Sequence, residues 1–219
     1  MVGDLKVVFH VKRPSDTSLA VAAEALGVRL DDAQAARLAR FESLLSERAV
    51  DLGMIARSDA DRLRERHVLD SLRAAAVLRD ADREALDIGS GAGLPGIPVA
   101  IASSDVTVRL VEPRRARIAF LELAVERLGL ENVAVVPATI ETVRLRVDVC
   151  LARAFAQLPK AWEAAFPRLR PHGRLVYFAG AGSGTESPEV PAGCSAIEVV
   201  PAPRGSVIES AGPLVIMTA

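Results

Sequence analysis

A glycine-rich turn at residues 87–98 (DIGSGAGLPGIP) constrains the fold of this chain more than any other segment. The apolar run 85–88 leads into the turn, and Pro95 or Pro98 suits the first turn of a following helix. Glycines let the backbone turn sharply and let a ligand approach where no Cβ stands in the way. The segment therefore predicts a strand, a ligand-binding turn and a helix, in that order.

Around residue 84 the hydrophobic pattern changes from purely helical to alternating strand and helix. Upstream, an irregular arm at 1–16 precedes helices predicted at 18–26, 31–49 (with Asp31 or Asp32 as N-cap) and 58–78. Downstream, strands are predicted at 85–88, 107–111, 133–137, 147–151 and 174–178, with helices at 115–128 and 158–166 among them. Such alternation predicts a parallel sheet with crossover helices.

Two further β-rich runs, 195–200 and 214–218, are separated only by a connection that contains Pro and Gly. A connection of that kind is a poor crossover helix, so the two runs predict an antiparallel pair at the edge of the sheet. The expected fold class is α/β, with a mostly parallel Rossmann-like sheet of class I methyltransferase type. We expect an N-terminal helical segment (1–80) packed on a cofactor-binding domain (81–219).

The glycine turn fits two known patterns. Gly91, Gly93 and Gly96 form GxGxxG, the fingerprint of dinucleotide-binding domains. Alternatively, Asp87 followed by Gly89, Gly91 and Gly93 forms the D-x-G-x-G-x-G pattern of class I methyltransferases, which bind S-adenosylmethionine. An acid before the first glycine suits the amino group of a methionine moiety and would repel a pyrophosphate. The second pattern is therefore favoured, and the dinucleotide enzyme remains the alternative.

Glu112 closes the strand that follows the turn. A carboxylate at that place can accept hydrogen bonds from the hydroxyls of an adenosine ribose. It is therefore a second candidate for cofactor binding.

Three runs resemble the 16S rRNA guanine-N7 methyltransferases of the RsmG (GidB) type. They are RHVLDS at 66–71, the glycine turn at 87–98 and ARAFA at 152–156. The resemblance covers roughly residues 30 to 180, and FHVK at 9–12 and LVEP at 110–113 further resemble the actinobacterial branch. It implies methyl transfer from S-adenosylmethionine to N7 of a guanine in 16S rRNA, with the small ribosomal subunit as partner.

The resemblance also implies particular site residues. Cofactor contacts are implied at Gly89, Leu94, Glu112, Ile140, Glu141 and Arg153, in addition to Asp87, Gly91 and Gly93 of the motif. No catalytic acid or base is identified, and Arg153 and His67 are the candidates for positioning the reactants. Candidates for RNA binding are Arg66, His67, Arg114, Arg115 and Arg117.

One departure from the family leaves other functions open. The family's fifth strand leads into Lys-Gly, whereas residues 178–180 are Phe-Ala-Gly. The alternatives are a small-molecule methyltransferase and a catalytically weakened relative that only binds RNA.

The chemistry of guanine N7 agrees with the residues present. N7 has a free lone pair and no proton to lose, so alignment of the nucleophile is the main catalytic task. Methylation of cytosine C5 needs a thiolate nucleophile, and Cys150 lies within an apolar strand. Segment 151–159 (LARAFAQLP) lacks the Asn/Asp-Pro-Pro-Tyr/Phe motif typical of amino-nitrogen methyltransferases.

Composition excludes several other classes. Neither of the two cysteines has a nearby Cys or His at ligand spacing, so no metal site is expected. No apolar run reaches the roughly 18 to 20 residues that a membrane span needs, so we expect a cytoplasmic protein. A monomer is the favoured oligomeric state. The net charge of −1 does not by itself indicate nucleic-acid binding, although arginines gather in 57–73 and 109–117.

Overall fold

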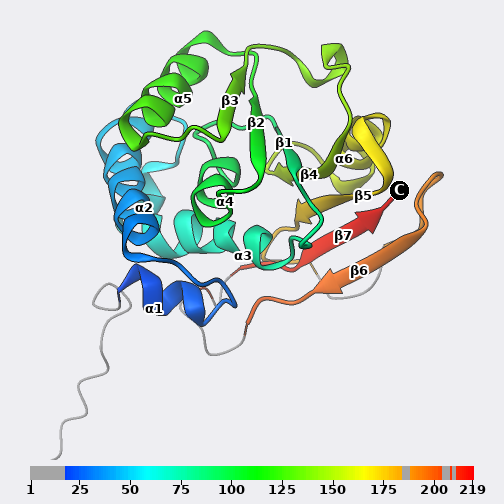
Figure 1. Cartoon of the computed structure of the whole chain (residues 1–219), viewed down its shortest axis with the longest axis horizontal. Helices are drawn as coiled ribbons and strands as arrows, with labels where there is room; N and C mark the ends of the chain where they lie inside the picture. The colour runs from blue at the N-terminus through cyan, green and yellow to red at the C-terminus, as the bar shows by residue number, and fades with distance from the viewer. Residues whose placement is uncertain (1–17, 184–187, 204–207, 209–210) are drawn as a thin grey trace, which may run out of the picture.

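The computed structural model describes residues 18–183, 188–203, 208 and 211–219, and the predicted arm at 1–16 lies outside this part. A seven-stranded sheet has the order β3-β2-β1-β4-β5-β7-β6 (Figure 1). The strands are β1 (Glu84–Ile88), β2 (Thr107–Val111), β3 (Val133–Val136), β4 (Val147–Arg153), β5 (Leu169–Phe178), β6 (Ala196–Val200) and β7 (Leu214–Thr218). The first five strands are parallel, and β7 is antiparallel to both β5 and β6, as the sequence predicts.

Helices connect these strands and precede them. The α-helices are α1 (Leu19–Glu24), α2 (Asp32–Leu44), α3 (Asp70–Ala76), α4 (Gly96–Ala102), α5 (Arg115–Leu128) and α6 (Leu158–Ala165). Shorter 3-10 or π turns are η2 (Leu45–Ala49), η3 (Arg57–Arg62), η4 (Arg64–Leu69), η5 (Ile140–Thr142) and η6 (Phe166–Arg168). Within the described ranges, no helix combines the length and the apolar character needed to cross a membrane.

Two hydrophobic clusters cover the two faces of the sheet, because successive strand residues point to opposite sides. In β4, Val149 and Leu151 belong to the cluster that the N-terminal helices, α4 and α5 cover, while Cys150 and Ala152 belong to the cluster under α6. Figure 1 shows α2, α4 and α5 together on one side of the sheet and α6 on the other.

The strand order reverses between β1 and β4. The chain proceeds outward from β1 to β2 and β3, then returns to place β4 on the other side of β1. In open α/β sheets, ligands bind in the crevice outside the carboxyl ends of the strands at such a switch point. The fold thus points to the ends of β1 and β4 as the place for a site.

The N-terminal helices share their core with the sheet. Leu38, Phe41 and Leu45 are fully buried in the same cluster as Ile97 of α4 and Leu121 of α5. The division into a helical segment at 1–80 and a cofactor domain at 81–219 stays a prediction.

The helix predicted at 58–78 is divided into η3, η4 and α3. Leu63 and Val68 are both buried although they are five residues apart. Five residues match the i→i+5 bonding of a π turn, whose wider spacing brings both side chains to one face. The sequence pattern predicts a helix here but not its local widening.

The fifth strand is longer than predicted, beginning at Leu169 rather than residue 174. Leu169 pairs with Val147, and the register then shifts before Arg174 pairs with Val149. The first half of the strand was not predicted because it contains Pro171, a left-handed His172 (φ 65°) and Gly173. Proline and glycine are disfavoured inside strands.

Gln34 ties the N-terminal helices to α4. Its side chain completes a capping box with Asp31 at the start of α2. Its amide nitrogen also donates to the carbonyls of Ile101 (2.9 Å) and Ala102 (3.3 Å) at the end of α4. One side chain therefore satisfies two helix ends.

We expect Gln34→Glu to lower the free energy of unfolding by about 1–3 kcal/mol. Glutamate keeps the oxygen that caps α2 but replaces the donor to α4 by a carboxylate facing two carbonyls. Urea denaturation measures the change, and Asp31→Ala, which removes only the cap, should cost about 1 kcal/mol. A Gln34→Glu protein as stable as the wild type would show that the contact with α4 contributes nothing.

Candidate functional site

A cavity of about 520 Å³ opens at the carboxyl ends of β1, β4 and β5. Its walls come from the glycine turn (Gly89, Ser90, Gly91, Ala92, Leu94), the ends of β4 and β5 (Arg153, Ala154 and 177–181), the helical segment (Met54, Ile55, Glu65, Arg66, His67, Asp70), Arg117 of α5, and Ile208, Ala211 and Gly212 near the C-terminus. The cavity thus lies where the sheet reverses, between the sheet and the N-terminal helices.

The glycines of the turn have different physical roles. Gly89, Gly91 and Gly93 all have positive φ angles, of 70°, 56° and 82°. A Cβ on Gly93 would lie 2.4 Å from Ile97 Cδ1, and one on Gly89 would lie 2.9 Å from the Phe155 ring. A Cβ on Gly91 would lie 3.8 Å from the Gly89 carbonyl oxygen and 3.9 Å from Arg117 Nη1, which is ordinary contact. Gly93 therefore serves internal packing, while Gly91 leaves open space for a ligand.

Asp87 lies beneath the glycine turn and does not line the cavity. Its side chain is 1% exposed, and its Oδ2 accepts a hydrogen bond from the Gly96 amide at 3.1 Å. Its Oδ1 is buried without a hydrogen-bond partner in the described structure. Burial raises the pKa of this carboxyl to about 7, against the opposing effect of the Gly96 amide.

Glu112 joins the turn to β2. Its buried carboxylate accepts hydrogen bonds from the Gly91 amide (3.1 Å, to Oε2) and the Arg114 amide (3.0 Å, to Oε1). Arg117, which lines the cavity, places its Nη1 3.5 Å from the same Oε2. Glu112 therefore holds the glycine turn in place from behind the cavity wall.

The remaining predicted residues lie away from the cavity walls. Ile140 and Glu141 are in η5, which follows β3; Ile140 is buried and Glu141 is exposed. Arg114 and Arg115 are exposed at the start of α5. A cofactor contact at η5 and RNA contacts at Arg114 and Arg115 stay predictions.

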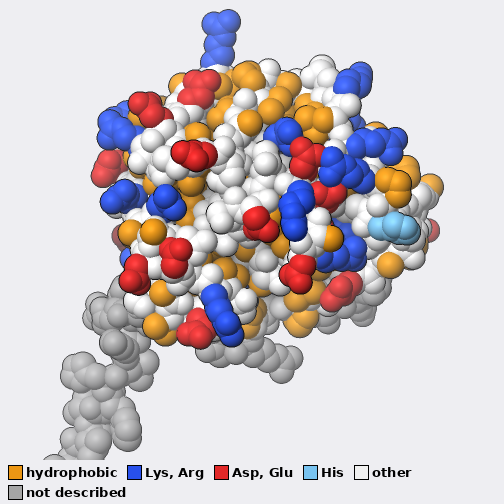
Figure 2. Space-filling view, viewed as in Figure 1, with side chains coloured by type: hydrophobic (Ala, Val, Ile, Leu, Met, Phe, Trp, Pro, Cys, Tyr) orange, Lys and Arg blue, Asp and Glu red, His pale blue; other side chains and the backbone are white. Residues whose placement is uncertain are grey.

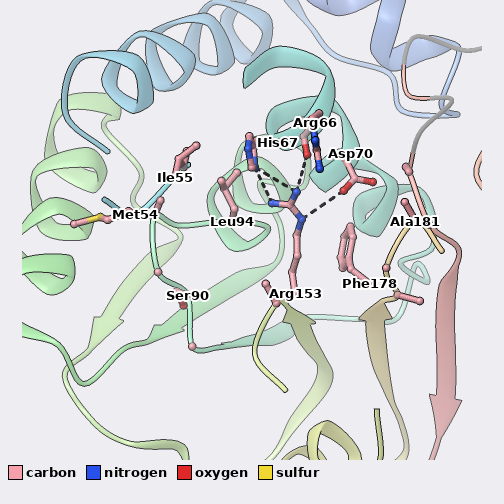
Figure 3. Close-up of a pocket in the computed structure, with 18 of the residues that line it drawn as sticks. Met54, Ile55, Arg66, His67, Asp70, Ser90, Leu94, Arg153, Phe178 and Ala181 are labelled. Atoms are coloured by element: carbon pink, nitrogen blue, oxygen red, sulfur yellow. Dashed lines mark hydrogen bonds and ion pairs between the residues drawn. The ribbon is translucent and has the colours of Figure 1, made fainter. Parts of the chain in front are cut away.

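Arg153, at the end of β4, connects the sheet to the helical segment (Figure 3). Its Nε lies 3.4 Å from Asp70 Oδ2, and its Nη2 donates to the Arg66 carbonyl at 2.6 Å. Both terminal nitrogens lie 3.3 Å from Nδ1 of His67. The sheet and the segment 66–70 thus meet at one guanidinium.

These contacts determine the protonation of His67. A guanidinium can only donate hydrogen bonds, so Nδ1 must accept and the imidazole proton must lie on Nε2. Burial, aided by the charge of Arg153, lowers the pKa of His67 to about 4. His67 is therefore neutral at pH 7 and has no positive charge to offer an RNA phosphate.

Several cavity residues were not singled out by the sequence. Tyr177 and Phe178 lie at the end of β5, and the Phe178 ring centroid is 5.9 Å from the Arg153 guanidinium carbon. The rule that ligands bind at strand carboxyl ends could have identified them. Met54 and Ile55 belong to a connection between helices, and no sequence pattern marked them as part of a site.

Charge is mixed rather than concentrated on the face seen in Figure 2, where basic and acidic side chains are interspersed. In the part of the chain that the structure describes, no group of three or more His, Cys, Asp and Glu side chains could hold a metal ion.

The fold is similar to that of solved methyltransferases. A SAM-dependent methyltransferase from Aquifex aeolicus matches 72% of this chain and 92% of its own, with a TM-score of 0.52 and 18% identity. M. jannaschii TYW2 in complex with AdoMet matches 69% of this chain and 74% of its own, with a TM-score of 0.51 and 15% identity. These likenesses show the class I methyltransferase fold that the sequence predicts.

Similar sequences carry one name. "Ribosomal RNA small subunit methyltransferase G" of Mycobacterium leprae is 42% identical over 159 residues, which are 70% of this chain and 62% of the relative. The protein of the same name from Streptomyces avermitilis is 36% identical over 193 residues, which are 85% of this chain and 76% of the relative. The match thus spans less than two thirds of the Mycobacterium leprae protein.

The family model described as "rRNA small subunit methyltransferase G" (GidB) matches residues 34–203. The model covers most of the chain, including the glycine turn and the segment 66–70. The resemblance found in the sequence is thereby confirmed: the chain belongs to the GidB family of rRNA small subunit methyltransferases.

Proposed function

We propose that this chain transfers a methyl group from S-adenosylmethionine to N7 of a guanine in 16S rRNA, as a cytoplasmic enzyme that acts on the small ribosomal subunit. The observation that carries the proposal is the glycine turn, which leaves open space for a ligand at Gly91 and is held from behind by two buried carboxylates. Membership of the GidB family and the names of the relatives support the RNA substrate.

Two features of the glycine turn favour this cofactor. Gly91 presents bare backbone to the open space, so a methionine moiety could approach closely. Asp87 and Glu112 lie buried behind the turn and place negative potential beside a ligand with an ammonium and a sulfonium. When bound, S-adenosylmethionine would supply an electrophilic methyl group.

Residues of the chain would hold the cofactor from two sides. Gly89, Gly91 and Leu94 line the cavity directly and are the proposed contacts for the methionine end. Glu112 and the η5 residues Ile140 and Glu141 are proposed for the ribose and adenine end. Asp87 and Gly93 would act through the shape and potential of the turn, since neither lines the cavity.

The protein need not remove a proton from guanine N7, because that nitrogen has a free lone pair. His67 is neutral, and both of its ring nitrogens are engaged. Burial keeps the Cys150 thiol protonated by raising its pKa, so it is no thiolate nucleophile. The described residues therefore favour a reaction in which orientation of the base is the protein's main contribution.

Methyl incorporation should distinguish this function from its alternatives. We expect label from S-adenosylmethionine in 16S rRNA of small subunits, at a position where chain cleavage by reduction and aniline reveals N7-methylguanosine. The rate of rRNA methylation at limiting RNA should fall with added salt, because binding through phosphate contacts releases counterions and is therefore weaker at high salt. Label only in a metabolite extract would indicate a small-molecule enzyme, and RNA binding without label would indicate a non-catalytic relative.

Gly91→Val should weaken binding of S-adenosylmethionine by at least about a hundredfold, since the branched side chain would project into the cavity. Isothermal titration calorimetry measures the dissociation constant. Gly129→Val is the matched control, because Gly129 has a similar φ of 60° and its Cβ would meet no atom within 4 Å. Equal affinities of the two variants for S-adenosylmethionine would contradict the placement of the turn in the cofactor site.

The pKa of Asp87 predicts a pH-dependent affinity. In the free protein Asp87 holds a proton below about pH 7, whereas a cationic ligand favours the carboxylate. The dissociation constant should therefore rise about tenfold as pH falls from about 7 to 5.5, with proton release on binding. His67, with a pKa of about 4, does not titrate in this window. Asp87→Asn should abolish this pH dependence. A wild-type dissociation constant that does not change with pH would contradict the proposed role of Asp87.

A further inference from the structure

Asp59 contacts the cavity wall from outside the cavity. It lies in η3, does not line the cavity, and its side chain is 14% exposed. Its Oδ2 lies 3.2 Å from Nε2 of His67, and its Oδ1 lies 3.2 Å from Nη1 of Arg66. The two oxygens thus hold two consecutive residues of the wall.

The contacts continue without a gap from Asp59 to the end of β4. The neutral His67 donates from Nε2 to Asp59 and accepts at Nδ1 from Arg153. The other Arg153 donors face Asp70 and the Arg66 carbonyl, which belong to the same segment (Figure 3). Asp59 therefore orients the imidazole, and the imidazole is one of the three groups that hold the guanidinium.

We propose that Asp59 is a positioning residue for methyl transfer: through the Nε2–H of His67 it fixes the Arg153 guanidinium and the wall of the cavity formed by residues 65–70. The proposal rests on the proposed function, because the wall it fixes is the one that a target base would meet beside the glycine turn.

The geometry separates this role from a general contribution to folding. Leu63 and Val68 are buried in the core without help from Asp59, and the contacts of Arg153 with Asp70 and the Arg66 carbonyl do not involve Asp59. In the described structure the Asp59 side chain forms ion pairs and hydrogen bonds with residues of the helical segment, and none with the glycine turn or Glu112. Loss of Asp59 should therefore affect alignment of the nucleophile more than affinity for the cofactor.

The test compares Asp59→Ala with Asp59→Asn, which keeps an oxygen that can accept the Nε2–H of His67. We expect Asp59→Ala to lower kcat for methylation of small subunits about tenfold, the size of one charge-assisted hydrogen bond. Asp59→Asn should recover most of that loss, and neither change should alter cofactor affinity more than about twofold. Asp61→Ala is the matched control, since Asp61 is exposed in the same short helix and should leave kcat unchanged.

A double-mutant cycle checks that Asp59 acts through His67. Asparagine at position 67 keeps an acceptor near the Nδ1 position but is too short to reach Asp59. In the His67→Asn background, Asp59→Ala should therefore cause no further loss of kcat. Independent, additive losses would overturn the proposed route through the imidazole.

Imidazole NMR gives a readout that does not depend on turnover. In the wild type, His67 should carry a proton on Nε2 that exchanges slowly with water, and in Asp59→Ala that exchange should become fast. Unchanged kcat in Asp59→Ala, or a cofactor affinity that falls in step with kcat, overturns the proposal. A wild-type protein that shows this proton but methylates no rRNA refutes the proposed function, and with it the role in methyl transfer.

Discussion

Two buried carboxylates hold the glycine turn by its backbone, and the rest of the site depends on this. A turn built mainly of glycine has few side chains through which it could be packed, so its amides must be fixed directly. Glu112, directly after β2, accepts from the Gly91 amide, and Asp87, in β1, accepts from the Gly96 amide. The sheet thus sets the position of the turn, and the turn presents bare backbone to the cavity at Gly91.

The same arrangement places both carboxylates behind the turn. Both side chains are almost fully buried, and neither lines the cavity. Asp87 would therefore act on a cationic ligand through its charge rather than by contact. In Asp87 this environment also makes the carboxyl unusually easy to protonate.

Much of this could be predicted from the sequence, because the informative residues are local in sequence. The run 85–98 contains the strand, the turn and the start of the helix, and the connection before 214–218 excludes a crossover helix. The network around Arg153 could not be predicted, since it joins residues 59, 66, 67, 70 and 153, which only the tertiary fold brings together. Periodicity identified His67 as part of a helix, but not that its Nδ1 faces an arginine from β4.

The different surroundings of the glycines have an evolutionary consequence. Gly93 is required by its neighbour Ile97, whatever the cavity contains, whereas nothing in the protein itself crowds Gly91. A descendant that no longer used its ligand would remain under selection at Gly93 and drift first at Gly91, toward Asn or Asp, which tolerate its left-handed φ of 56°. A glycine at the position of Gly93 in a distant relative is therefore weak evidence of activity. A glycine at the position of Gly91 is more informative.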